Sequence, residues 1–582
     1  MAHKIREVYI VHHSHTDVGY TDLQEQVIYN QANNIRRAVE LIEEGLEKGT
    51  NQKNLKWNCE TWYCVEQFLK VATEEEKKTF FDLVKKNSIG LSANYLNFND
   101  LADCEYLTEK IHEMQEVCAE EGVTVKTAMF ADINGISMGQ RDAMLANGVE
   151  FLYTNIHTHH GMYPLYQNQK PYFWENEDGK RLLVWSGEHY NLGNALGIVF
   201  NKNVNFMTEN YFGKAQGDVA EPLEKLYSNL TASMEEYEEN GYPYDFYITS
   251  VSGVFSDNAP INPAIADTVA LFNEKYGEEV TMRMVTLQEL YDLIRDKVAD
   301  APVYRGAIND WWGNGVGSTP YAVKHYKEAV RLNRICDRLE EKTGVHNADL
   351  VKAYGDNSLL YAEHTWGHSA TVTNPYDTMV TNLDMRKNSY ASKAHEAAAM
   401  RKNEQCHLLG DILRYYNLSG KVKAVSTSHE KRIFPVEFYV ETMNLPAVKV
   451  TDDKTNEGME VQLSAHPRGV LVSFLAEFEP MEKKSSLMKN SLHRHTPCLP
   501  EPHGSAQSAC AILSILMIPK AISCLTVWKT IPSKSAGRWA KELLLSITKK
   551  QRWKCASPDW RLSLLLSMSV PKSARVFMKS AV

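Results

Sequence analysis

Residues 8–22 of the chain, VYIVHHSHTDVGYTD, decide its fold class. The apolar, β-branched start of this stretch predicts a buried strand. Gly19 then marks a turn, and apolar residues recur at helical spacing at Ile35, Val39 and Ile42. We therefore expect the histidines of the stretch and Asp17 in a loop between the first strand and the first helix. In α/β folds, ligands and catalytic groups gather at this end of the strands.

The same stretch offers candidate metal ligands. His15-x-Asp17 places an imidazole and a carboxylate on one side of an extended segment, which suits two ligands of one ion. His13-x-His15 has the same spacing. A solvated or hydrogen-bonded polar turn is a third interpretation, and this stretch alone does not choose between them.

Length and composition bound the class of protein. The chain has 582 residues, of which 43% are hydrophobic and 23% charged, so three or four ordinary globular domains are expected. A net charge of -10 argues against nucleic acid as the main partner. No apolar run approaches the roughly 20 residues of a membrane span. Ten cysteines without a CxxC pair, and a start without a signal-like apolar run, predict a reducing, cytoplasmic setting.

The last hundred residues differ in composition from the rest. Residues 481–582 hold 17 Lys+Arg and 4 Asp+Glu, whereas residues 1–480 hold 46 and 69. The apolar clusters of this segment have no sustained period of two or 3.6. One hypothesis is a basic tail that binds an acidic partner. The alternative that we favour is a change of reading frame near residue 480.

The order of the remaining segments indicates three domains. Strand-like and helix-like segments alternate over residues 1–300, which predicts an α/β domain. Polar residues follow several of its strands, namely Asp100, Asp132, His157, His189 and Asp257. Residues 301–418 contain three long helical patterns, at 321–342, 349–360 and 378–416, which predict a helical bundle. Period-two alternation over residues 419–480 predicts the start of a β-sandwich domain.

Short motifs along the chain occur in the order of one known family. They are HSHTDVGY at 13–20, IGLSANYLNFND at 89–100, DINGIS at 132–137, SDNAP at 256–260, DWWGNGVGSTP at 310–320 and EHTWG at 363–367. Over about residues 5–415 the chain resembles the zinc-dependent α-mannosidases of glycoside hydrolase family 38. The resemblance implies an α/β barrel-like catalytic domain of the seven-stranded parallel β/α type, followed by a three-helix bundle and a partial β-sandwich.

The resemblance also implies roles for individual residues. Zinc would be held by His15, Asp17, Asp100 and His364. Asp100 would be the nucleophile of a retaining glycosidase that acts on α-mannosides, and Asp257 its general acid. The implied substrate-binding residues are Asp132, Trp311, Trp312 and Tyr20, and the residues that support the ligands are His13 and Glu60.

Structural interpretations stand beside these roles. Asp100 is a good helix N-cap, Asp132 and Asp257 lie in turn-forming sequences, and His364 and the tryptophans can serve as packing residues. The cluster His157, His159 and His160 is either a second metal site or a solvated loop.

Two other functions remain open. A barrel amidohydrolase or deacetylase would use His13 and His15 with a metal-bound water. A catalytically degenerate carbohydrate-binding relative would explain Thr365 in the place of a family aspartate and Val18 in that of a proline.

Overall fold

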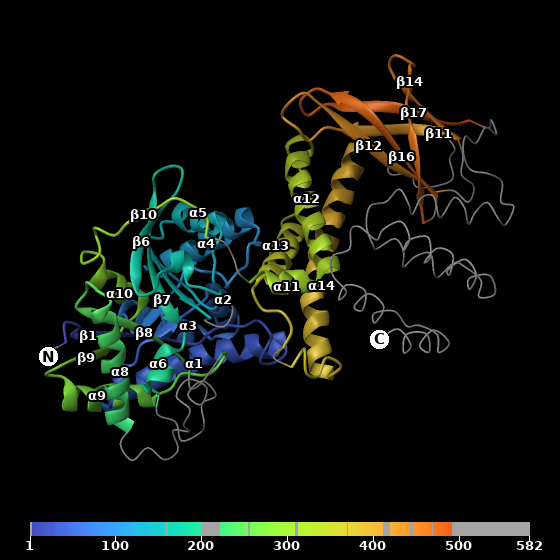
Figure 1. The fold of residues 1–582 in the computed structure, drawn as a ribbon. Helices are drawn as coiled ribbons and strands as arrows, with labels where there is room; N and C mark the ends of the chain where they lie inside the picture. The colour runs from blue at the N-terminus through green and yellow to red at the C-terminus, as the bar shows by residue number, and fades with distance from the viewer. Residues whose placement is uncertain are drawn as a thin grey trace, which may run out of the picture. The chain divides into compact units, whose positions relative to one another are not determined.

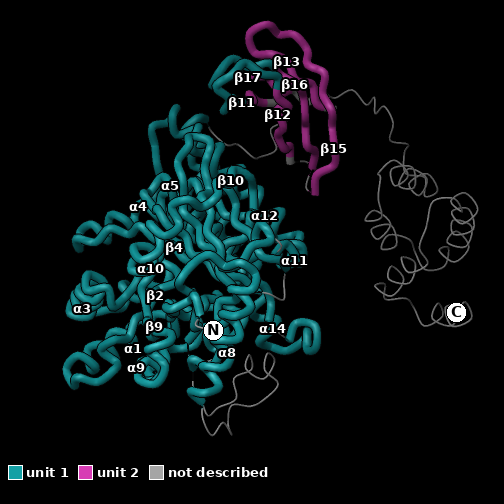
Figure 2. The backbone as a smooth tube through the Cα atoms, turned by 60° about the vertical axis from the view of Figure 1, so that its left-hand side comes forward, with its two compact units in different colours: residues 1–414, 423–433, 477–484 teal, residues 415–422, 434–476, 485–582 magenta. Residues whose placement is uncertain are grey.

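A computed structural model describes residues 3–157, 161–199, 222–253, 257–308, 312–368, 370–410, 419–441, 447–467 and 469–491. The chain divides into two compact units (Figure 2). The first comprises Met1–Arg414, Lys423–Ile433 and Glu477–Lys484, and the second Tyr415–Val422, Phe434–Ala476 and Ser485–Val582. The predicted α/β and bundle regions therefore belong to one compact unit.

Strand β1 (Glu7–His13) is the centre of the first sheet, whose order is β3-β2-β1-β8 with β9 also paired to β1. The other strands are β2 (Trp57–Cys59), β3 (Ile89–Leu91), β8 (Phe246–Ser252) and β9 (Thr281–Met284). All pairs are parallel. Six of the seven β1 residues are buried, as expected for a strand covered on both faces. His12 and His13 belong to this strand, so the predicted polar loop begins only at Ser14.

The second sheet has the order β10-β6-β7-β5-β4. Its strands are β4 (Thr127–Phe130), β5 (Phe151–Ile156), β6 (Lys170–Glu175), β7 (Arg181–His189) and β10 (Val303–Tyr304). Strands β6 and β7 pair antiparallel, because the turn that joins them is far too short for the crossover that a parallel pair requires.

The expected seven-stranded parallel barrel is not confirmed. The described strands of the α/β region form two five-stranded sheets and no closed barrel. The two sheets approach each other beyond β3, where the amide of Ala93 donates to the carbonyl of Thr127 over 2.9 Å. The mixed α/β architecture itself is confirmed.

Helices surround the two sheets (Figure 1). They are α1 (Gln24–Lys48), η1 (Asn51–Asn54), α2 (Trp62–Val71), α3 (Glu74–Lys85), α4 (Cys104–Glu120), α5 (Met138–Ala146), η2 (Pro164–Tyr166), α6 (Leu192–Leu196), α8 (Pro222–Glu239), α9 (Ala264–Tyr276) and α10 (Leu287–Ile294). Local sequence sets several of their ends. A capping box of Thr73 and Glu76 starts α3, and Gly49 ends α1 in a left-handed conformation with φ 69°.

The predicted bundle is present as α12 (Pro320–Thr343), α13 (Ala348–Ala362) and α14 (Thr378–Leu409), preceded by the short helix α11 (Gly313–Ser318). Figure 1 shows α12, α13 and α14 side by side. Ala394 and Ala398 of α14 are buried against Ala329, Leu332 and Tyr354, so small residues allow the helices to approach closely. Helix α14 ends before Gly410, earlier than predicted, and residues 411–418 lie outside the described residues.

Seven described strands follow the bundle. They are β11 (Ser419–Val425), β12 (Arg432–Glu441), β13 (Ala447–Asp452), β14 (Gly458–Met459), β15 (Gln462–His466), β16 (Gly469–Phe478) and β17 (Lys483–Ser491). They form sheets of order β11-β17-β13-β14 and β12-β16-β15. Strand β17 lies beyond residue 480, where we expected the pattern to fail, and pairs with β13 from Ala447↔Ser491 to Asp452↔Ser486.

The rest of the basic segment, residues 492–582, lies outside the described residues, so both hypotheses about it stay predictions. No helix in the described parts of the chain combines the length and apolar character of a membrane span.

Candidate metal centre and active site

Four side chains converge at the carboxyl ends of the central strands. One ligand atom from each of His15, Asp17, Asp132 and His364 lies within 4.8 Å of the other three, and all four residues are buried. Nε2 of His364 is 3.1 Å from Oδ1 of Asp17 and 3.0 Å from Oδ2 of Asp132. Nε2 of His15 is 3.5 and 3.8 Å from the same two oxygens. Two imidazoles and two carboxylates thus point at one small volume.

The donor set fits a zinc ion. Zinc in proteins takes imidazole nitrogen and carboxylate oxygen ligands, most often four of them. Nε2 of both histidines is buried and makes no hydrogen bond of good geometry within the described structure. A buried nitrogen without such a bond is costly, and a bound cation would satisfy both.

The loop after β1 presents His15 and Asp17. The amide of His15 donates to Oγ of Ser252 at the end of β8 over 2.9 Å. The amide of Asp17 donates to Oδ1 of Asn258 over 3.2 Å, and the Asn258 side-chain amide donates back to the Asp17 carbonyl. The loop is therefore held from the neighbouring strand.

Asp132 follows β4 and has an unusual backbone conformation. Its φ is 78°, in the left-handed region that few residues other than glycine adopt. Its carbonyl accepts a hydrogen bond from the amide of His157 over 2.9 Å. Asp132 was predicted as a substrate-binding residue, and the structure instead places its carboxylate among the candidate ligands.

His364 reaches the site because the end of α13 docks on the segment after β3. The amide of His364 donates to the carbonyl of Asn97 over 2.9 Å, and the amide of Asn99 donates to the carbonyl of Ala362 over 3.2 Å. Phe98 and Glu363 form a β-bridge between these two bonds. A ligand from the bundle thereby joins ligands from both sheets.

The structure does not bring Asp100 to the cluster. Asp100 is exposed, whereas the four clustered side chains are buried. The preceding segment Asn97–Asn99 is engaged by the end of α13, and the chain turns to the surface after it. The described cluster therefore contains Asp132 and not Asp100, and the role of Asp100 as a ligand stays a prediction.

A carboxylate lies behind each clustered imidazole. Nδ1 of His15 is 3.0 Å from Oε1 of Glu60. Glu60 also accepts bonds from the amide of Thr16 (3.1 Å) and the side chain of Asn97 (2.6 Å). Its Oε2 lies 2.6 Å from Nδ1 of His13. Such carboxylates fix the tautomer and the ring orientation of a metal-binding histidine.

His13 is turned away from the cluster. Its Nε2 lies 3.1 Å from the carbonyl oxygen of Tyr190, and its Nδ1 faces Glu60. Both ring nitrogens thus face oxygen atoms of the protein. That His13 supports the site, rather than binding the ion, stays a prediction.

Glu363 has the same role behind His364. Oε1 of Glu363 lies 2.9 Å from Nδ1 of His364, and its Oε2 lies 3.0 Å from Nζ of Lys387 on α14. Burial alone would raise the pKa of Glu363, but the charges of Lys387 and then His364 lower it to about 2. Neither Glu363 nor Lys387 was predicted as a site residue. Glu363 directly precedes His364 in the motif EHTWG, and this was the one sequence signal for a carboxylate near that histidine.

Electrostatics mark the cluster as a cation site. Burial favours the neutral imidazole of His15, yet the charge of Glu60 and the nearby aspartates raise its pKa well above the usual range. Burial likewise opposes ionisation of Asp17, but contact with His15 and His364 holds its pKa below the usual value. Without an ion, protonated histidines compensate the carboxylates, and a divalent cation would do so in their place.

A third carboxyl group, that of Asp257, lies beside the four clustered side chains. Burial, and then the charge of Asp17, raise the pKa of Asp257 to about 7. Its Oδ1 is buried without a hydrogen-bond partner among the described residues. Its side chain hydrogen-bonds to Tyr190, whose ring packs on that of His15 with centroids 4.4 Å apart. Tyr190 was not predicted, since no local motif distinguishes it.

This arrangement can be compared with known proteins. The model of the glycosyl hydrolases family 38 N-terminal domain matches residues 6–307. The chain belongs to glycoside hydrolase family 38. Among curated proteins, nothing matches it.

Two solved structures resemble this family 38 chain in fold. An α-mannosidase from Enterococcus faecalis V583 gives a TM-score of 0.57 at 14% identity, covering 85% of this chain and 57% of that one. A glycosyl hydrolase family 38 protein from Enterococcus faecalis gives 0.51 at 13% identity, covering 86% and 55%. This chain therefore spans less than two thirds of the length of either protein. At this identity the likeness concerns the fold alone.

Two of the remaining predicted residues, Tyr20 and Trp312, lie beside the cluster. Burial, and then the charges of Asp17, Asp257 and Asp132, raise the pKa of half-buried Tyr20. The indole of Trp312 donates to the carbonyl of His364 over 3.0 Å, and its ring lies 5.8 Å from the His364 ring. Trp311 lies outside the described residues.

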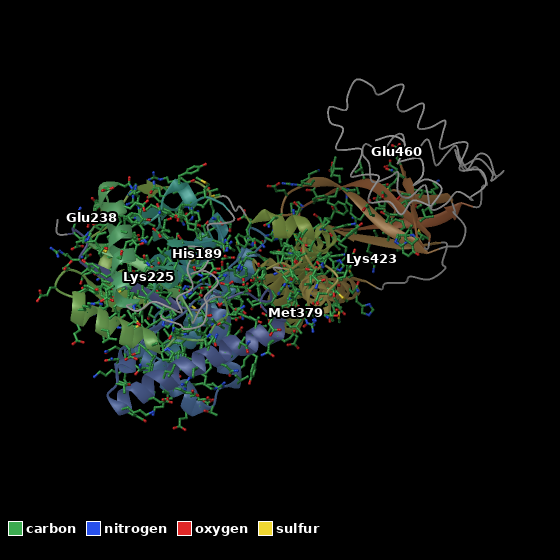
Figure 3. All side chains as sticks on the ribbon, turned by 60° about the horizontal axis from the view of Figure 1, so that its bottom comes forward. His189, Lys225, Glu238, Met379, Lys423 and Glu460 are labelled. Atoms are coloured by element: carbon green, nitrogen blue, oxygen red, sulfur yellow. The ribbon has the colours of Figure 1, made fainter. Side chains whose placement is uncertain are left out.

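The predicted second histidine cluster is described only at His157, whose ring lies 5.1 Å from that of His189. His159 and His160 are outside the described residues. Figure 3 labels His189, at the end of β7.

Proposed function

We propose that the chain is a zinc-dependent retaining glycoside hydrolase, most directly an α-mannosidase that acts on α-mannosides or oligosaccharides. The observation that carries the proposal is the meeting of His15, Asp17, Asp132 and His364, with a carboxylate behind each imidazole. Family 38 membership and the α-mannosidase of similar fold support the same reaction class.

His15, Asp17, Asp132 and His364 would hold the zinc. When bound, the ion would supply Lewis-acid binding of sugar hydroxyls and compensate the charge of the carboxylates. The protein's own contribution is orientation: Glu60 and Glu363 fix the two imidazoles, and Asn258 fixes the backbone of Asp17.

Asp132 is the proposed nucleophile, in place of Asp100. A retaining glycosidase needs one ionised and one protonated carboxyl group beside the scissile bond. Contact with His364 and the charge of His15 lower the pKa of Asp132 against the effect of burial, so its carboxylate is ionised. Its oxygen would attack the anomeric carbon as the glycosidic C–O bond breaks, giving a glycosyl ester.

Asp257 is the proposed general acid. Burial, and then the charge of Asp17, raise its pKa to about 7, so a proton is present on it below that pH. Its Oδ1 has no hydrogen-bond partner among the described residues. The proton of Asp257 passes to the leaving oxygen. The resulting carboxylate then takes a proton from water, whose oxygen attacks the anomeric carbon and releases Asp132.

The ring contacts around the cluster suggest where a sugar lies. Trp312 and Tyr20 flank the candidate ligands, and we propose that they bound the substrate position, with Trp311 as a further candidate. A carbohydrate is the proposed partner. The absence of a nucleic-acid partner and the cytoplasmic setting stay predictions.

The two alternatives make different demands on the structure. The amidohydrolase interpretation needs His13 as a ligand, and both ring nitrogens of His13 face protein oxygens instead. A degenerate binding protein would bind glycans without turnover. In this chain Thr365 donates to Oδ1 of Asp17 over 3.1 Å, so this residue takes part in the ligand network.

The test is hydrolysis of a panel of chromogenic α-glycosides by the full chain, loaded with zinc and then treated with a chelator. We expect turnover of an α-mannoside that the chelator removes and added zinc restores. If the zinc-loaded chain leaves the whole panel intact, the hydrolase proposal is wrong. Glycan binding without turnover would support the degenerate alternative.

A further inference from the structure

Lys387 is a buried lysine whose contacts converge on the end of one helix. It lies on α14, and only 2% of its surface is exposed. Its Nζ donates to the carbonyl of Leu360 (3.0 Å), the carbonyl of Glu363 (2.7 Å) and Oε2 of Glu363 (3.0 Å). The ammonium also lies 4.3 Å from the ring centre of Trp366. All three N–H groups are therefore directed at the residues that end α13.

Glu363 connects this lysine to a candidate ligand. One carboxylate oxygen faces Lys387, and the other lies 2.9 Å from Nδ1 of His364. The amide of Val18, beside the ligand Asp17, donates to that second oxygen over 3.4 Å. The carboxylate is thus held from two sides, and its direction determines the direction of the imidazole.

The other imidazole has no such lysine. Glu60, behind His15, is held by the Thr16 amide and the Asn97 side chain. Among the residues that the structure describes, no Lys or Arg pairs with Glu60. The two halves of the site therefore differ: one is built within the α/β region, and the other depends on a cation from the bundle.

We propose that Lys387 is a positioning residue that sets the cation affinity of the site from the helical bundle, by holding Glu363 so that Nε2 of His364 faces Asp17 and Asp132. The inference rests on the proposed function in so far as the site holds a divalent ion. It assigns the bundle a part in the metal centre beyond supplying His364.

Removing the ammonium group of Lys387 should weaken binding of the ion more than it destabilises the fold. Without Lys387, Oε2 of Glu363 loses its charged partner and keeps only the amide of Thr365, which donates over 3.0 Å. The carbonyls of Leu360 and Glu363 also lose the bond from Nζ. The Glu363 carboxylate, and with it the His364 ring, is then held less firmly, by Val18 and Thr365 among the described residues. Loss of a group that orients a metal-binding histidine typically weakens metal binding by about 10- to 100-fold.

The experiment measures Co²⁺ binding to the full chain, followed by the visible absorption of the bound ion. We expect Lys387→Met to bind Co²⁺ about 10- to 100-fold more weakly than the wild type, with a changed absorption spectrum. The matched control is Lys393→Met, an exposed lysine on the same helix, which should leave affinity and spectrum unchanged. Equal affinity and spectrum in the wild type and Lys387→Met would overturn the inference.

A second variant separates positioning from a general structural role. If Lys387 acts through Glu363, then Glu363→Gln also weakens Co²⁺ binding. In a chain that already carries Glu363→Gln, Lys387→Met should reduce the Co²⁺ affinity much less than it does in the wild type. Fully additive effects would refute the proposal. Wild-type affinity in Glu363→Gln would refute it too, and that measurement stands even if Lys387→Met does not fold. A wild-type chain that binds no Co²⁺ would instead refute the metal site itself.

Discussion

Nε2 of His364 lies 3.0 Å from Oδ2 of Asp132, although one residue follows a helix of the bundle and the other follows a strand of the second sheet. The contact exists because the end of α13 pairs with the segment after β3. The α/β region and the bundle therefore share one site, and neither region contains the candidate ligand set without the other.

Asp257→Asn should slow hydrolysis by about 10²- to 10⁴-fold for substrates with poor leaving groups, because it removes the proposed proton donor. A substrate with a strongly acidic leaving group needs little protonation, so its first step should be much less affected. Steady-state kinetics with both kinds of substrate measure the difference. An equal loss for both would contradict the acid role.

The pH dependence of kcat/KM should also depend on Asp257. Asp257 can donate a proton only below its raised pKa of about 7, so kcat/KM should fall as the pH rises through that value. The metal-loaded wild type and Asp257→Asn are compared across this range. If kcat/KM of Asp257→Asn falls with rising pH as it does in the wild type, another group is responsible for that fall.

Glu60→Gln should weaken zinc binding by about 10- to 100-fold, since the carboxylate that orients His15 also contacts His13. Competition with a chromogenic chelator measures the affinity. Glu66→Gln is a suitable control, because Glu66 hydrogen-bonds to Tyr95 and Lys110 rather than to a candidate ligand. The same loss in both variants would argue against a specific orienting role.

Ile10→Ala should lower the free energy of unfolding by about 2–5 kcal/mol. Ile10 is fully buried in β1 and pairs with β8 and β9, so the shorter side chain leaves a cavity in the centre of the sheet. Denaturant unfolding measures the change. As a control, Met138→Ala, at an exposed position, should change the free energy of unfolding little. A loss below 1 kcal/mol for Ile10→Ala would place β1 outside the stabilising core.

Local patterns in the sequence predict most of the elements. The β-branched run at Val8–Val11 lies in β1, and the apolar spacing from Ile35 to Ile42 lies in α1. The three bundle helices follow their periodicity closely, apart from the early end of α14 at Gly410. Closure of the sheets is a long-range property, and the sequence could not exclude a barrel.

The site was predictable where its residues belong to a distinctive motif. His15, Asp17 and His364 converge as the family resemblance implies. Asp100 and Asp132 both follow short strands, and only the docking of α13 on Asn97–Asn99 distinguishes them. Lys387 and Tyr190 act through contacts distant in sequence, which no single segment reveals.

The most direct test of the account is the zinc content of three purified full-length proteins: the wild type, Asp132→Ala and Asp100→Ala. We expect one tightly bound zinc per chain in the wild type and in Asp100→Ala, and a large loss of zinc in Asp132→Ala. Retention of zinc by Asp132→Ala together with its loss from Asp100→Ala would contradict the proposed centre.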